Sequence, residues 1–260
     1  MNCNRSKKLI LGITAASLLF AAGIPAAMAE EEVPTADASI GLYSKYIWRG
    51  FELSKDSMVI QPSLTVSYKG FGANLWANLD TDVYGTDSGN WNETDFTLSY
   101  DGAYEKFGYG VGWIYYALEG VDEIVSLTEA TEVSDTQEFY ATVSYDTILS
   151  PSLTVYYDTD NFAGDWYANF SIGHSFAVTE TASLDLGLAI GYSDNADYNE
   201  FHDGLISASM SFPVGKHLSI TPELYYSFAL SDEAEGAIMD PAMSNDDSFV
   251  YGGVSASFSF

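Results

Sequence analysis

Residues 249–260 alternate between two chemistries and stop on an aromatic residue. Because strand side chains repeat every second residue, they divide between two faces. The first face carries Val250, Gly252, Val254, Ala256, Phe258 and Phe260, and the second carries Tyr251, Gly253, Ser255, Ser257 and Ser259. The pattern predicts a strand with one face suited to lipid and one suited to water. A half-buried strand of a soluble sandwich is the alternative.

The amino terminus indicates export. Residues 1–29 contain a basic region with Arg5, Lys7 and Lys8, an apolar core over residues 9–22, and Ala27-Met28-Ala29 before Glu30. This is the three-part pattern of a cleaved secretory signal, and the core is shorter than the roughly 20 apolar residues of a spanning helix. We therefore expect residues 30–260 to form the mature chain. Cys3 precedes the core, so we expect no disulfide and no cysteine-bound metal in the mature protein.

The composition is strongly acidic yet sufficient for ordered structure. The chain has 37 acidic and 9 basic residues, and three of those basic residues precede Glu30. Such a surface repels nucleic acid, so no nucleic acid partner is expected. The content of 47% hydrophobic and 15% aromatic residues argues against disorder. A chain without a further long apolar run can cross a membrane only as a closed barrel of strands.

Twelve segments of about ten residues with this alternation follow Asp37. Short turns and longer polar loops connect them alternately. We place them at residues 38–49, 58–68, 71–80, 95–100, 107–117, 137–145, 152–159, 166–176, 183–193, 205–212, 218–230 and 248–260. The fold class expected is all-β: an up-and-down antiparallel transmembrane barrel of the bacterial outer membrane with both termini periplasmic. A terminal strand ending on an apolar-facing Phe260 is similar to the assembly signal of such barrels, so the barrel-assembly machinery is an expected partner.

The charges are distributed unevenly between the predicted connections. Half of the mature chain's basic residues lie in short turns, at Lys69, Lys106 and Lys216. Acidic residues crowd two longer loops, which contain Glu119, Asp122, Glu123, Glu129, Glu132 and Asp135, and Asp232, Glu233, Glu235, Asp240, Asp246 and Asp247. We interpret these acids as a solvated rim. The sharper hypothesis is that they bind divalent cations that bridge them to lipopolysaccharide, because Ca²⁺ and Mg²⁺ prefer oxygen ligands. No spacing matches a dedicated metal loop, and we name no metal ligands and no cofactor.

If the apolar faces contact lipid, the opposite faces line the lumen. The predicted pore-lining residues are Lys45, Arg49, Trp76, Asp80, Asp95, Glu138, Asp158, Asp185 and Glu223. Two basic residues on the first strand would face acids on the other strands, and acidic side chains favour cations. Inward glycines favour an opening, whereas inward tyrosines could fill it. Lys45 and Arg49 could equally form structural ion pairs across the lumen.

A family resemblance agrees with this reading. The run Tyr46-Ile-Trp-Arg-Gly-Phe-Glu-Leu-Ser54, followed by Gln61-Pro62 and by Gly70-Phe-Gly-Ala-Asn-Leu-Trp76, resembles the opening of the TorF-like family of bacterial porins. Ala77 and Asn78 depart from the small Gly or Ser residues that often follow the tryptophan there. The resemblance implies an outer-membrane barrel and a porin, but it supplies no substrate and no functional residues. We expect Trp48-Arg49-Gly50 to shape the exit of the first strand, with Gly50 allowing a bend.

The function expected is therefore passive diffusion of small hydrophilic solutes, with a preference for cations. A structural or adhesive barrel without transport is the alternative, because long acidic loops are also interaction surfaces. An enzyme is not expected, because His174, His202 and His217 have no persuasive Ser partner. A soluble sandwich would leave unexplained the outward aromatics at segment ends, which resemble interfacial girdles: Trp48, Tyr68, Trp113, Tyr145 and Phe212. The oligomeric state and the solute do not follow from the sequence.

Overall fold

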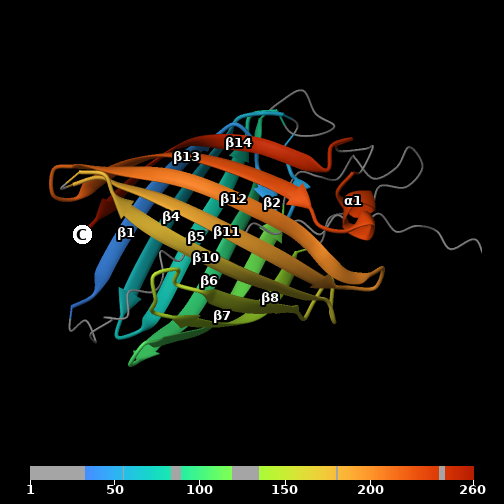
Figure 1. The fold of residues 1–260 in the computed structure, drawn as a ribbon, viewed down its shortest axis with the longest axis horizontal. Coiled ribbons are helices and arrows are strands. Elements are labelled where there is room, and N and C mark those ends of the chain that lie inside the picture. The colour runs from blue at the N-terminus through green and yellow to red at the C-terminus, as the bar shows by residue number, and fades with distance from the viewer. Residues whose placement is uncertain (1–32, 55, 83–88, 119–134, 180, 240–243) are drawn as a thin grey trace, which may run out of the picture.

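Twelve antiparallel strands close into a barrel in the computed structural model (Figure 1). The structure describes residues 33–54, 56–82, 89–118, 135–179, 181–239 and 244–260. The barrel strands are β1 (Thr35–Tyr43), β4 (Val59–Tyr68), β5 (Phe71–Asp80), β6 (Asn90–Tyr104), β7 (Phe107–Leu118), β8 (Thr136–Tyr145), β9 (Ser152–Asp158), β10 (Trp166–Ala177), β11 (Ser183–Asp194), β12 (Asn199–Val214), β13 (Leu218–Ala229) and β14 (Ser248–Ser259). Each of the twelve predicted segments overlaps one of them, so the predicted fold class is confirmed.

The first and last strands pair and close the sheet. Ile40 of β1 is opposite Ala256 of β14 and, on its other side, opposite Pro62 of β4. Closure leaves the barrel without an unpaired edge, which is the condition for strands to lie in lipid. The described part of the chain contains no helix that is both long enough and apolar enough to span a membrane.

The outer surface is apolar, as the alternation predicts. Leu64 and Val111 are 49% and 54% exposed although each is paired with a neighbouring strand on both sides. Tyr68, Tyr145 and Phe212 are also exposed on this surface. In contrast, Trp76 and Tyr251 on the opposite parity are buried inside the barrel. The apolar faces therefore point outward, and the interior combines polar groups with aromatic rings.

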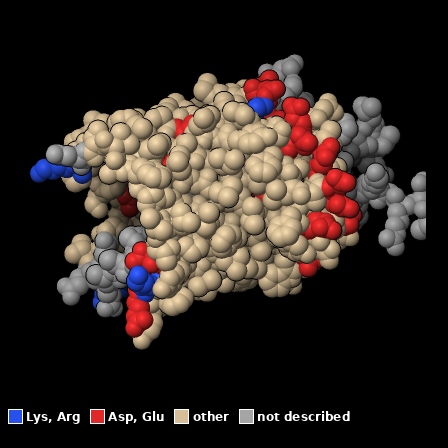
Figure 2. Space-filling model, viewed as in Figure 1, with Lys and Arg blue, Asp and Glu red and all other residues tan. Residues whose placement is uncertain are grey.

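The two ends of the barrel differ. At the turn end, where β1 begins and β14 ends, the connections are short. Two of them, Lys69-Gly70 and Glu105-Lys106, have only two residues, and at Lys69-Gly70 the φ angles of 51° and 81° give the turn whose twist suits a hairpin. The opposite end, the loop end, carries the longer connections and the short helix α1 (Asp232–Ile238). Figure 2 shows that acidic residues gather around the loop end.

Several predicted boundaries are wrong in an informative way. The first strand ends at Tyr43 and not at Arg49, and β12 begins at Asn199, before the predicted start at residue 205. β6 extends to Asn90 and Tyr104 because its polar ends still pair with β5 and β7. The predicted signal at residues 1–29 lies outside the described residues, as do Glu119, Asp122, Glu123, Glu129, Glu132 and Asp240.

Residues 44–58 fold into the barrel and not outward; we call them the inner segment, of which Lys55 is not described. The segment contains a small hairpin of β2 (Ile47–Trp48) and β3 (Phe51–Glu52). Arg49 and Gly50, with φ angles of 43° and 85°, form its turn. The predicted bend at Gly50 is therefore present, but it lies inside the barrel. The predicted girdle position of Trp48 is wrong, since this side chain is 6% exposed.

Candidate functional site in the barrel lumen

The inner segment crosses the lumen and packs on both of its walls. Tyr46, Trp48 and Leu53 join a core cluster with Trp76 of β5 and with Ile114, Tyr116 and Leu118 of β7. Ile47 joins a second cluster with Leu205, Tyr225 and Tyr251 of β12, β13 and β14, and with Ile238 of α1. Exposing these apolar side chains to water would cost free energy, so their packing holds the segment inside the barrel.

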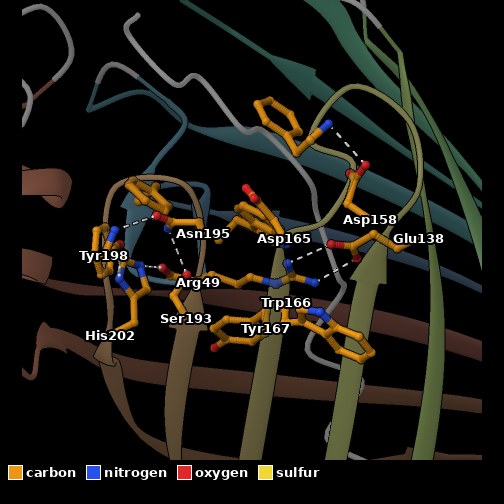
Figure 3. Close-up of a pocket in the computed structure, with 13 residues that line it drawn as sticks. Arg49, Glu138, Asp158, Asp165, Trp166, Tyr167, Ser193, Asn195, Tyr198 and His202 are labelled. Atoms are coloured by element: carbon orange, nitrogen blue, oxygen red, sulfur yellow. Dashed lines mark hydrogen bonds and ion pairs between the residues drawn. The ribbon is translucent and has the colours of Figure 1, made fainter. Parts of the chain in front are cut away.

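Arg49 ties the inner segment to the wall. Its two terminal nitrogens donate to the two carboxylate oxygens of Glu138 on β8, each at 2.8 Å. The guanidinium also lies over the rings of Trp48, Tyr156 and Tyr167, at 4.2 to 4.6 Å from the centroids. A planar cation held in a fork and stacked on aromatic faces is well positioned and partly desolvated. Figure 3 shows Arg49 extending from the hairpin to Glu138.

His202 holds the backbone of the same turn. Its Nε2 lies 2.8 Å from the carbonyl oxygen of Arg49, and its Nδ1 lies 2.7 Å from the hydroxyl of Tyr198 (Figure 3). A carbonyl can only accept, so Nε2 carries the proton and Nδ1 of the neutral ring accepts from Tyr198. The predicted strand at residues 205–212 left His202 in the connection before it. Strict alternation back from Ile206 would turn His202 outward, and the β-bulge in the β11–β12 pairing between Ile190 and Tyr192 instead brings it inside, where it is 1% exposed.

Lys45 acts within the inner segment. Its Nζ lies 2.7 Å from Glu52 Oε1 and also contacts the carboxylate of Asp56. Both partners belong to the segment itself, so this ion pair shapes the segment without binding it to the barrel wall. The predicted transverse field between Lys45 and the acidic wall is therefore reduced, because the charge is balanced locally. Arg49 and Glu138 are the predicted residues that the structure joins directly.

The remaining predicted acids do not form one constriction. Asp80 accepts from the Ser57 hydroxyl and from the backbone N–H of Asp82. Asp158 accepts from Thr136 and from two backbone N–H groups of the loop after β9, so both residues fix loops at the loop end. Asp95 lies in the interior near Tyr116, its partner across the β6–β7 ladder. Asp185 lies near the turn end, where Ser183 donates to it at 3.3 Å.

A cavity of about 530 Å³ occupies the lumen between the inner segment and the turn end. It collects three of the predicted residues, Lys45, Trp76 and Glu223, from β5, β13 and the inner segment. The walls add hydroxyl groups and rings, among them Ser39, Ser63, Thr65, Tyr43, Tyr225 and Tyr251. Such a lining of polar groups and aromatic faces can hold a small hydrophilic solute.

The loop end is electrostatically strained around Asp165, in the loop between β9 and β10. Burial, together with the carboxylates of Asp158, Asp197 and Asp194, raises the pKa of Asp165 to about 6. Asp165 lines the small pocket of about 80 Å³ beside Arg49. Within the described ranges, no three His, Cys, Asp or Glu side chains are grouped so as to hold a metal ion.

Comparison with solved structures gives distant barrels. The NanC porin has 12% identity and a TM-score of 0.51, with 86% of this chain and 98% of that chain covered. An outer-membrane channel from Pseudomonas putida F1 has 10% identity and a TM-score of 0.49, with 87% and 95% covered. The outer membrane phospholipase A of Escherichia coli has 13% identity and a TM-score of 0.47, with 86% and 95% covered. At these identities the NanC likeness establishes the fold, that of outer-membrane barrels, and the lower scores add no argument.

No curated protein matches the sequence. A family model does match, over residues 28–234, and its description is "Bacterial protein of unknown function (Gcw_chp)". The match does not confirm the TorF-like assignment, although the outer-membrane barrel that this resemblance implied is the fold observed. Because the matched region covers most of the chain, the protein belongs to the Gcw_chp family of bacterial proteins of unknown function.

Proposed function

We propose that this protein is an outer-membrane channel for passive diffusion of small hydrophilic solutes, with a preference for cations. The observation that carries the proposal is the cavity of about 530 Å³ enclosed by the closed barrel and lined by hydroxyl and carboxylate groups. A barrel with only a structural role has no need of a polar space in its interior. The inner segment narrows the lumen on the loop-end side of this cavity, and this narrowing limits passage to small solutes.

The preference for cations rests on charge. Acids outnumber bases 37 to 9, and acidic groups gather around the loop end (Figure 2), while Lys69, Lys106 and Lys216 lie at the short turns. Rings of acids at a pore mouth raise the local concentration of cations. We also propose that loop-end acids bind lipopolysaccharide through divalent cations, and that Phe260 engages the barrel-assembly machinery during insertion.

The placement of the histidines supports a function without catalysis. His174 Nδ1 lies 2.7 Å from the carbonyl of Ile148, and His217 Nδ1 lies 2.8 Å from the carbonyl of Ser259. His202 is engaged by Tyr198 and Arg49. Each ring is thus used to fix backbone, and among the described residues none of these hydrogen bonds joins a histidine to a Ser or Thr hydroxyl, the pairing that activates such a nucleophile.

Single-channel recording of the refolded mature protein in planar bilayers tests the proposal. We expect discrete conductance steps and a reversal potential in a KCl gradient that indicates K⁺ over Cl⁻. Liposome swelling with small neutral solutes gives an independent readout of the open lumen. Absence of steps and of swelling, in protein whose heat-modifiable migration shows intact folding, would instead support the structural or adhesive barrel.

A further inference from the structure

Glu223 lies at the centre of a group of hydroxyls in the cavity wall. Its Oε1 accepts from Tyr43 at 3.2 Å and from Ser255 at 2.6 Å, and its Oε2 accepts from Tyr225. An ionised carboxylate has about four acceptor positions, so one remains on the Oε2 side. Neutral hydroxyls orient and hold the carboxylate without cancelling its charge.

No cation of the described residues pairs with Glu223. The ion pairs among the described residues join Lys45 to Glu52 and Asp56, and Arg49 to Glu138. Lys45 lines the same cavity, but it is engaged by two carboxylates of its own segment. Asp37 adds a second acid at the turn end of this cavity. The cavity therefore carries a negative charge. A cationic solute would balance this charge, whereas a neutral solute would not and an anion would be repelled.

Aromatic rings lie next to this carboxylate and line the same cavity. The rings of Tyr225 and Tyr251 stack with centroids 5.0 Å apart and planes 21° apart. The ring of Tyr43 occupies the space above Gly41, where a Cβ would collide with it, so this ring lies against the inner wall. Tyrosine faces attract cations through their quadrupole, and more strongly where water is partly excluded. Ile47 and Trp76 add apolar surface on the side of the inner segment.

We propose that this cavity binds small alkylammonium ions, with the ammonium group at Glu223 and the alkyl chain against Ile47 and Trp76. The inference rests on the proposed channel function and specifies its solute class. The ammonium group would donate to the free acceptor position of Oε2, beside the stacked pair of Tyr225 and Tyr251. Charge, hydrogen bonding and apolar contact then favour one class of solute, organic monovalent amines.

Calorimetric titration of the refolded protein in detergent micelles with propylammonium chloride tests this inference, with 1-propanol and sodium propionate as neutral and anionic analogues. We expect saturable binding of propylammonium alone. Glu223→Gln keeps the shape and removes the charge, and it should weaken binding about tenfold or more, as expected for a hydrogen bond to a charged group. Asp146→Asn, which removes an exposed acid in the turn after β8, controls for net charge and should leave affinity unchanged.

The aromatic contribution has its own pair of variants. Tyr251→Phe keeps the ring and should keep the affinity, whereas Tyr251→Leu should weaken binding about fivefold, as for a lost cation–π contact. Equal binding of 1-propanol, no binding of propylammonium, or indifference to Glu223→Gln would overturn the proposed site. Conductance steps without propylammonium binding would reject the site and leave the channel, whereas Glu223-dependent binding without any conductance would reject the channel and keep the site.

Discussion

At the scale of single residues, the inward glycines have a role that alternation alone does not reveal. We interpreted small inward residues as favouring an opening, yet a Cβ on Gly41, Gly112 or Gly191 would collide with the ring of Tyr43, Tyr140 or Tyr167. These glycines thus make room for tyrosines that lie flat against the inner wall. Parity predicts the face of each residue, but the neighbour across the ladder depends on register, which the sequence does not state.

We expect Gly112→Ala to destabilise the barrel, because the added methyl group meets the ring of Tyr140 on the paired strand. Overpacking of this kind costs about 1–3 kcal/mol. Urea unfolding of the refolded protein, followed by heat-modifiable migration, measures the loss. Gly236→Ala in α1, where a Cβ meets no atom within 4 Å, serves as the control and should not destabilise. In a Tyr140→Ser background Gly112→Ala should lose its destabilising effect, and an undiminished cost there would contradict the steric explanation.

At the scale of elements, the inner segment shows where sequence reasoning stops. Tyr46 and Trp48 continue the alternation of β1, so their period fits a lipid-facing strand as well as a hairpin inside the lumen. Both environments bury apolar side chains, and the hydrophobic pattern cannot separate them. The Arg49-Gly50 pair, which suits a two-residue turn, is the one local sign of the hairpin. Glu138 and Trp76 lie on regular strands, where alternation defines the face of each residue, and both are buried inside the barrel.

We expect Arg49→Glu to release the inner segment from β8, because it places a carboxylate against Glu138. Breaking a buried ion pair costs about 3–5 kcal/mol of stability. In bilayers the conductance should increase severalfold, with more current noise. Combining Arg49→Glu with Glu138→Arg should restore both properties. Lys45→Gln is the matched comparison, since Lys45 pairs only within the segment, and its effect on conductance should be smaller. An unchanged conductance and reversal potential in Arg49→Glu would remove this segment as the constriction.

At the scale of the whole molecule, the strand count, closure and outward face were all predictable from the sequence, because lipid imposes the same two-residue period on every strand. The filling of the interior was not, because it depends on contacts between distant segments such as Tyr198, His202 and Arg49. The uneven charge was predictable in composition and in position. The effect of this charge on stability is seen only in the structure, where loops from different hairpins meet at the loop end.

The crowding of acids at the loop end makes the stability of the barrel depend on pH. Burial and neighbouring acids raise the pKa of Asp165 to about 6, compared with about 3.9 in an unfolded chain. Between these values the folded state binds more protons than the unfolded state, so the free energy of unfolding falls as pH rises through this window. We expect Asp165→Asn to remove this part of the decrease, and therefore to stabilise the barrel at pH 7.5 more than at pH 4. Urea midpoints at the two pH values measure the difference, with Asp146→Asn at the turn end as the control. An equal effect of both substitutions would show that total charge, and not the crowding of acids around Asp165, governs stability.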